Sequence, residues 1–256
     1  MHLLAPSRGP ILFNNLEPEV PEASLVCCPL RFPHPGSNQR WKRTSLSYSY
    51  VSGSWGQVRE RLDSLRETRV PDVLYPRLFG MAWSEIDTAL QRMHCNCQPV
   101  HAAGVFRISH GNSLGAKLLL LFLRLPPPNT AAQVELIVRP IGESETWLRL
   151  FDGKPIVTVQ RESVSGLLAE RFGPLEFRFR LSFADHTIHY RQVGVILHLA
   201  LPFFSEIPLP RWLSPHVSAW ETAGPSGMET RILVEVSAPL AGPLISYEGE
   251  LRREQV

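Results

Sequence analysis

The chain has 256 residues, of which 44% are hydrophobic and 20% are charged. This composition supports a domain with a substantial apolar core and excludes a fibrous or wholly disordered chain. Lys and Arg number 26 against 24 Asp and Glu, a formal net charge of +2, so no strong overall field indicates nucleic acid or an anionic membrane as a partner.

No apolar run is long enough to cross a bilayer. The longest unbroken run, residues 118–123, falls far short of the roughly 20 residues that a membrane-spanning helix needs. The first residues also lack the basic-then-apolar layout of a signal peptide. We therefore expect a cytoplasmic protein without a transmembrane segment.

Residues 1–70 differ in composition from the rest of the chain. They are rich in proline and show no sustained hydrophobic period. Such a segment buries too little apolar surface to offset the entropy of ordering it. We predict a poorly ordered N-terminal extension over 1–70, in which the capping-box spacing of Ser54 and Gln57 allows one short helix. A folded domain is predicted over 71–253.

Three helical segments are predicted. Residues 71–80 should form one or two helical turns that end at Gly80. An apolar stripe within 86–93 follows a second capping signal and ends at His94. Residues 113–124 are almost continuously apolar, and a helix that is apolar all round must be covered on most sides. We expect it to lie, with the 86–93 helix, across the concave face of a sheet.

From residue 102 onward the dominant hydrophobic period is two, the period of strands with one buried face. The clearest strand is 174–184, in which five apolar residues alternate with polar ones. Short turn sequences, such as Asp152-Gly153 and Gly173-Pro174, separate the runs and require antiparallel neighbours. The predicted fold class is α+β: a curved antiparallel sheet or half-barrel of about eight to ten strands, packed on one or two apolar helices.

Familiar catalytic and metal-binding motifs are absent from the sequence. The segment 110–117 lies between a strand and a helix, but its glycine spacing matches no phosphate-binding loop. No nucleophile elbow and no zinc-binding helix occurs. Cys95 and Cys97 lie between His94 and His101, yet a Cys-x-Cys pair is too tight for a tetrahedral zinc site. We expect no catalytic residue, no cofactor and no metal.

The candidate ligand-binding residues are polar and aromatic side chains that the strands bring together. Glu145, Trp147 and Arg149 share one face of their strand. They could anchor the polar end of a ligand beside an aromatic wall, or form a cross-strand ion pair over a half-buried indole. The full predicted set is His94, Glu145, Trp147, Arg149, Glu170, Arg171, Phe177, Phe179 and Tyr247.

Several short motifs follow one another in order between residues 74 and 252. They include Leu74-Tyr75, Trp147-x-Arg149-x-Phe151-x-Gly153, Glu170-Arg171-Phe172-Gly173-Pro174-Leu175 and Tyr247-x-Gly249-x-Leu251. In these motifs the chain resembles an uncharacterised bacterial domain family, a domain of unknown function. Its members occur alone or C-terminal to a saccharopine-dehydrogenase-like NAD(P)-binding domain. The chain departs from the family at Glu250 and around Cys95. The resemblance implies no reaction.

Three functional hypotheses follow. The first is non-catalytic binding of a small apolar or amphipathic molecule in a cavity between sheet and helices, which fails if residues 118–123 fill that cavity. The second, implied by the resemblance, is an accessory domain that docks on a separate saccharopine-dehydrogenase-like NAD(P) oxidoreductase. The third is an enzyme with an acid–base pair formed by His94 and Glu170.

Overall fold

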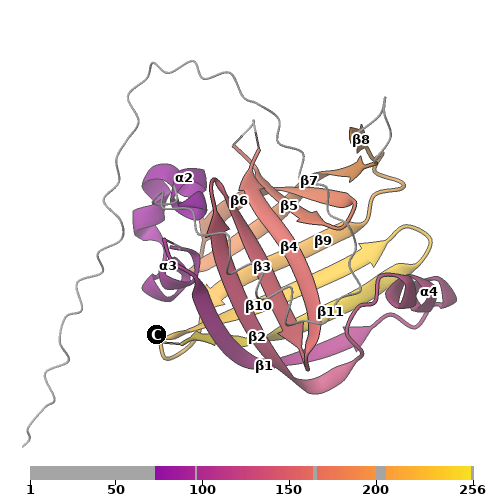
Figure 1. Ribbon diagram of the computed structural model, residues 1–256, viewed down its shortest axis with the longest axis horizontal. Helices are drawn as coiled ribbons and strands as arrows, with labels where there is room; N and C mark the ends of the chain where they lie inside the picture. Colours follow the sequence, from indigo (N-terminus) through magenta and orange to yellow (C-terminus); the bar gives the residue numbers. More distant parts are fainter. Residues whose placement is uncertain (1–72, 96, 164–165, 200–205, 255–256) are drawn as a thin grey trace, which may run out of the picture. The chain divides into compact units, whose positions relative to one another are not determined.

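The computed structural model describes residues 73–95, 97–163, 166–199 and 206–254 (Figure 1). The predicted extension over 1–70 lies outside the described residues. Helix α2 (Leu74–Phe79) is followed by a 3-10 turn, η1 (Gly80–Glu85), and by α3 (Thr88–His94). Helix α4 (Leu114–Phe122) follows the first strand in the sequence and precedes the second. Gly80 ends α2 with a positive φ of 54°, as the sequence predicts.

Eleven strands account for most of the described chain. They are β1 (Val100–His110), β2 (Asn129–Ile141), β3 (Ser144–Phe151), β4 (Lys154–Glu162), β5 (Leu168–Phe172), β6 (Leu175–Ala184), β7 (Thr187–His198), β8 (Glu206–Pro208), β9 (His216–Ala223), β10 (Glu229–Ala238) and β11 (Gly242–Arg253). All their pairings are antiparallel, which confirms the expectation from the short turns.

The sheet closes on itself. Its strand order is β6-β5-β4-β3-β2-β1-β11-β10-β9-β7-β8, and β6 also pairs with β7 along its whole length. Ten strands therefore form a closed barrel, with β8 added beside β7 (Figure 1). The barrel is more closed than the predicted half-barrel. Closure pairs the backbone groups that an open sheet leaves exposed at its edges.

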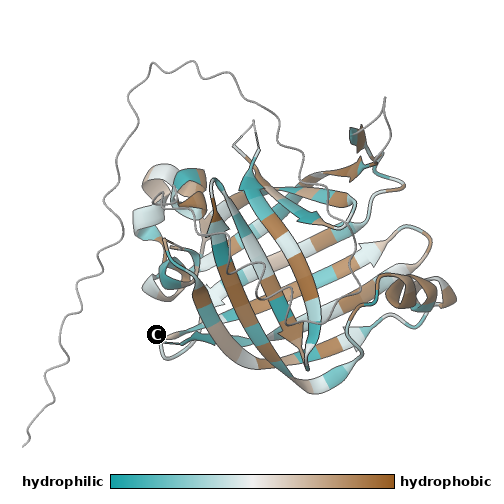
Figure 2. Ribbon diagram, viewed as in Figure 1, coloured by the Kyte–Doolittle hydropathy of each residue, from teal (hydrophilic) through white to brown (hydrophobic). Residues whose placement is uncertain are grey.

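The barrel interior holds the apolar core. Inward-facing side chains alternate with outward-facing ones along the strands, so hydrophobic and polar bands alternate in Figure 2. Phe106, Leu136, Phe151 and Phe179 are among the inward side chains, and each is at most 3% exposed. The apolar positions of the predicted 174–184 strand belong to β6 and pack in or against this core.

Helix α4 does not lie where the sequence predicts. It packs beside β11 at one end of the barrel, and its buried residues are Ala116 and Leu120. Ser113 caps it by accepting a hydrogen bond from the Ala116 amide and donating one to the Ala241 carbonyl. The prediction was wrong because a closed barrel has no open concave face for a helix to cover. No helix in the described part of the chain has the length and apolar character needed to span a membrane.

Candidate functional site

Two helical side chains enter the barrel from the end opposite α4. Tyr75 comes from α2, which contacts β4 and β6, and His94 comes from α3, which contacts β9 and β10. Both side chains are fully buried. Their rings stack with centroids 3.8 Å apart. The two helices therefore supply polar groups to the core as well as apolar surface.

These two side chains belong to a buried hydrogen-bond network. The Tyr75 hydroxyl lies 3.0 Å from Gln160 Oε1 and 3.1 Å from the Tyr190 hydroxyl. Tyr190 donates to Glu221 Oε1 at 3.0 Å, and His94 Nε2 lies 2.5 Å from Glu221 Oε2. Each hydroxyl carries one hydrogen, so the two tyrosines can donate to only two of their three partners at a time.

The network joins opposite walls of the barrel. Glu221 is on β9, whereas Trp147 is on β3, five strands away in either direction round the ring of ten. His94 lies between them, bonded to Glu221 and with its ring centroid 5.6 Å from that of Trp147. Because this bridge crosses the interior, it fixes the helical end of the barrel in one arrangement.

A second polar group lies on the neighbouring strands. Arg149 Nη1 donates to Thr158 Oγ1 at 2.9 Å, and Nη2 lies 3.4 Å from Glu170 Oε1. The Arg149 guanidinium also stands over the Trp147 ring, with Cζ 5.1 Å from the centroid. The Trp147 indole N–H donates to Glu145 Oε2 at 3.1 Å. Four of the predicted site residues thus converge here, and Trp147 links them to His94.

The charges of the two groups are strongly coupled. Burial by itself raises the pKa of Glu221, but the neighbouring His94 and the hydrogen bonds from His94 and Tyr190 outweigh burial and hold the pKa below its usual value. Burial lowers the pKa of Arg149, but Glu170 and the other nearby acidic groups together outweigh burial and raise it above its usual value. Glu221 is therefore a carboxylate and Arg149 a cation at neutral pH.

The pKa values of the three interior tyrosines are raised, whereas that of Glu221 is lowered. Burial, and then the charge of Glu221, raise the pKa values of Tyr75 and Tyr190 well above the usual value. Burial also raises the pKa of Tyr247 to about 12, with Arg149 acting against that rise. All three hydroxyls are consequently neutral hydrogen-bonding groups at physiological pH.

Aromatic side chains form the apolar wall of the site. Phe177 and Phe179 stack with centroids 6.4 Å apart, and Phe179 meets Tyr190 edge to face. Tyr247 packs edge to face against Phe151 at 5.3 Å. The predicted residues Phe177, Phe179 and Tyr247 therefore belong to the interior, with Tyr247 half-buried.

A protein-family model matches most of the sequence that forms this structure. The model for a domain of unknown function, DUF4166, matches residues 86–251, which is 166 of the 256 residues. The chain belongs to the DUF4166 family. The matched part includes α3, ten complete strands and most of β11, and every predicted site residue, whereas Tyr75 and α2 precede it. Neither the curated proteins nor the solved structures contain a match to the chain.

The structure differs from two of the expectations about this candidate site. Arg171 lies on the outer face of β5, exposed, and donates to the Gly173 carbonyl, because the period of two turns it away from its neighbour Glu170. The hypothetical acid–base pair also differs from the observed contacts: His94 bonds Glu221, and Glu170 bonds Arg149.

Four residues of the network were missed by the sequence analysis: Tyr75, Gln160, Tyr190 and Glu221. The signal for Glu221 was a carboxylate in register with Val217 and Ala219 on the inward face of a strand. Burying a charge is costly unless it is paired, so such a position implies a partner. The sequence offered no means of saying that this partner is His94, 127 residues away.

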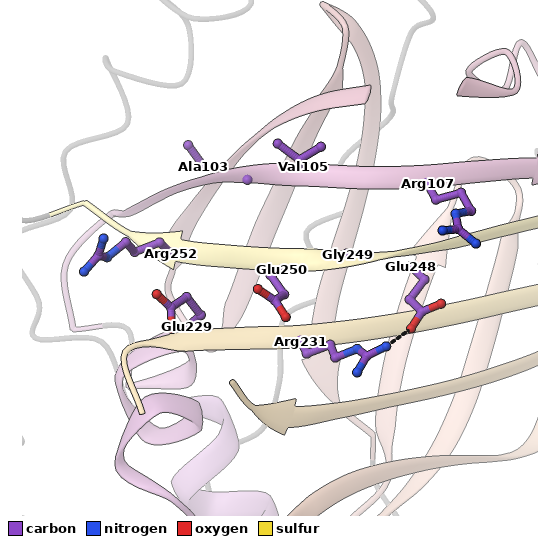
Figure 3. A pocket seen from close by; sticks show the side chains of 10 residues that line it. Ala103, Val105, Arg107, Glu229, Arg231, Glu248, Gly249, Glu250 and Arg252 are labelled. Carbon is purple, nitrogen blue, oxygen red and sulfur yellow. Dashed lines mark hydrogen bonds and ion pairs between the residues drawn. The ribbon is translucent and has the colours of Figure 1, made fainter. Parts of the chain in front are cut away.

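The described residues contain no group of three or more His, Cys, Asp or Glu side chains that could hold a metal ion. A surface hollow of about 560 Å³ lies on the outer face of β1, β10 and β11 (Figure 3). Three arginines and three glutamates line it, including the ion pair of Arg231 and Glu248. Its charges balance one another, so it does not favour a charged ligand.

Proposed function

We propose that the barrel interior binds a small amphipathic molecule, without catalysis, and that Arg149 and Glu170 hold its polar end. The observation that carries this proposal is the exposure of these two side chains. They project among Trp147, Thr158 and the inward aromatic residues, yet Arg149 keeps 17% and Glu170 19% of its side-chain surface exposed. Buried ion pairs are normally enclosed by their partners, so this pair still has capacity for another polar group.

The polar end of the ligand should be uncharged. Arg149 is already balanced by Glu170, and the same interior contains Glu145 and Glu221 beside His94. A further full charge would lack a partner and would be costly to bury. A hydroxyl or amide group, by contrast, can accept a hydrogen bond from Arg149 and donate one to Glu170.

The apolar part of the ligand would lie along the inward faces of the strands. Several inward-facing hydrophobic residues are only half-buried, although they pack against the core; these are Ile156, Phe172, Leu175, Leu181, Phe183, Val217, Ala219, Val234 and Val236. Ligand pockets are mostly apolar with a few placed polar groups, and this distribution has that character. Helix α4 lies at the end of the barrel beside β11, where Leu120 joins the core and Leu119 packs against it. Leu118, Leu121 and Phe122 are exposed, so they leave the interior to other side chains.

The proposal is tested by native mass spectrometry of the full chain as purified, followed by denaturing extraction to identify a bound molecule. Ala219→Trp would fill the interior from β9, while Ser218→Trp adds the same indole on the exposed outer face. We expect a small amphipathic molecule to accompany the unmodified protein and the Ser218→Trp variant, and to be lost from a folded Ala219→Trp variant.

The opposite result is equally clear. Two results together would show that the protein's own side chains fill the interior. The first is that no small molecule co-purifies with the unmodified protein. The second is that Ala219→Trp lowers the free energy of unfolding by about 1–3 kcal/mol, the usual cost of overpacking. The binding proposal would then be abandoned.

A further inference from the structure

An exposed hydrophobic surface lies at the α4 end of the barrel, outside the site described above. We call it the apolar rim and define it as Leu114, Leu118, Leu121 and Phe122 of α4 with Leu240 of the β10–β11 turn. The four α4 side chains are between 60% and 81% exposed, and Leu240 is fully exposed. Most of helix α4 is hydrophobic in Figure 2. A helix that is apolar on its exposed face as well as its buried face is expected to contact a second apolar phase.

The two parts of the apolar rim are held side by side. The Ser113 hydroxyl donates to the Ala241 carbonyl at 2.5 Å. A Cβ added to Gly115 would lie 3.3 Å from the Ala241 Cβ, so the helix backbone packs directly on the turn. Leu240 itself has a φ of +64°, an uncommon conformation for a residue other than Gly or Asn. The fold therefore presents Leu240 next to α4 in a fixed position.

Exposed hydrophobic residues are concentrated at this end of the molecule. Among the described residues, eleven large hydrophobic side chains are exposed; five form the apolar rim. Trp212 and Leu213 are two more, and they precede β9, whose first residue pairs with the β10 end that leads into the Leu240 turn. Tryptophan is typical of the boundary between lipid headgroups and acyl chains.

The charged residues within the segments that carry the apolar rim are cations. Lys117 and Arg124 are exposed within and just after α4, and Arg211 adjoins Trp212. Residues 111–128 and 238–243 contain no carboxylate. The carboxylates Asp152 and Glu206 belong to other segments at this end of the barrel. A protein interface would be matched by many charge patterns, whereas exposed hydrophobic side chains on segments whose only charges are cations fit an anionic lipid surface.

We infer that the protein binds peripherally to anionic membranes through the apolar rim. The α4 axis would lie along the membrane surface, with Leu118, Leu121 and Phe122 inserted at the level of the headgroups and Lys117 beside the lipid phosphates. This inference uses surface residues alone and does not depend on ligand binding inside the barrel.

The test is co-sedimentation of the full chain with phosphatidylcholine vesicles, prepared with or without phosphatidylglycerol. We expect binding to the anionic vesicles that weakens as salt is raised. Leu121→Glu combined with Phe122→Glu should weaken it at least about tenfold, because two apolar side chains no longer insert. Lys117→Gln should weaken it about fivefold, and only on anionic vesicles.

The matched control is Met81→Glu, which adds a charge at an equally exposed apolar side chain in η1, far from α4 in the fold. The Met81→Glu variant should bind vesicles as the unmodified protein does. All variants should keep the melting temperature of the unmodified protein. Equal binding to neutral and anionic vesicles, or binding unaffected by the double substitution, overturns the inference. The inference is also overturned if the protein does not bind vesicles but forms a dimer, or a complex with an oxidoreductase, and the double substitution dissociates that complex.

Discussion

Replacing Glu221 by alanine tests whether the buried network holds the barrel together. The Glu221 side chain is 10% exposed and receives hydrogen bonds from His94 and Tyr190. Without it, His94 Nε2 loses its partner inside the core, and His94 Nδ1 already has no hydrogen-bond partner among the described residues. Removing one member of a buried ion pair costs about 3–5 kcal/mol. For a domain of this size, that corresponds to a fall in melting temperature of about 6–20 °C.

The measurement is urea unfolding at neutral pH, followed by circular dichroism. Glu221→Gln should lose less than Glu221→Ala, about 1–3 kcal/mol, because the amide oxygen keeps one acceptor for Tyr190 or His94. Glu235→Ala on the adjacent strand β10 is the matched control, since Glu235 is exposed and its loss should change stability by less than about 0.5 kcal/mol. A Glu221→Ala variant within about 1 kcal/mol of the unmodified protein would refute the reasoning.

The same substitution predicts a dependence on pH. The pKa of Glu221 in the folded protein lies below its usual value near 4.5, so the folded state keeps the carboxylate charged where the unfolded chain binds a proton. The stabilisation is complete above the unfolded pKa and disappears as the pH falls through the lowered folded pKa. The difference in unfolding free energy between the unmodified protein and Glu221→Gln should therefore shrink as the pH falls through this acidic range.

Three further substitutions test other parts of the structure by urea unfolding. Trp147→Ala should cost about 3–5 kcal/mol because the indole is 2% exposed, and a much smaller loss would show that it borders open space. Glu176 of β6 forms ion pairs with Arg161 at 2.7 Å and Arg178 at 3.1 Å, and Glu176→Gln should cost about 1–3 kcal/mol, near the lower end because Arg161 is partly exposed. No loss would show that these ion pairs are energetically neutral. Gly104→Ala should cost about 1–3 kcal/mol or abolish folding, since the new Cβ would lie 1.8 Å from the Glu250 carbonyl oxygen, and an unaffected protein would contradict the close pairing of β1 and β11.

Part of the candidate site was predictable from local pattern. Glu145, Trp147 and Arg149 lie two residues apart on one strand, and strand geometry alone places them on one face. The stacked Phe177 and Phe179 follow from the same rule. Arg171 shows the limit of reading a motif as a unit, because the alternation that turns Glu170 inward turns its neighbour outward.

The sequence by itself determined the strands, the antiparallel pairing and the turns, because these depend on hydrophobic period and on residues close together in the chain. Only the tertiary structure decided that the sheet closes, because a period of two shows which face is buried but not whether β7 meets β6 and β9 across the ring. Closure in turn placed α4 beside the barrel instead of inside it. It also brought His94 to Glu221, since a charge buried inside a closed barrel must be paired with a group that the opposite wall or the end of the barrel supplies.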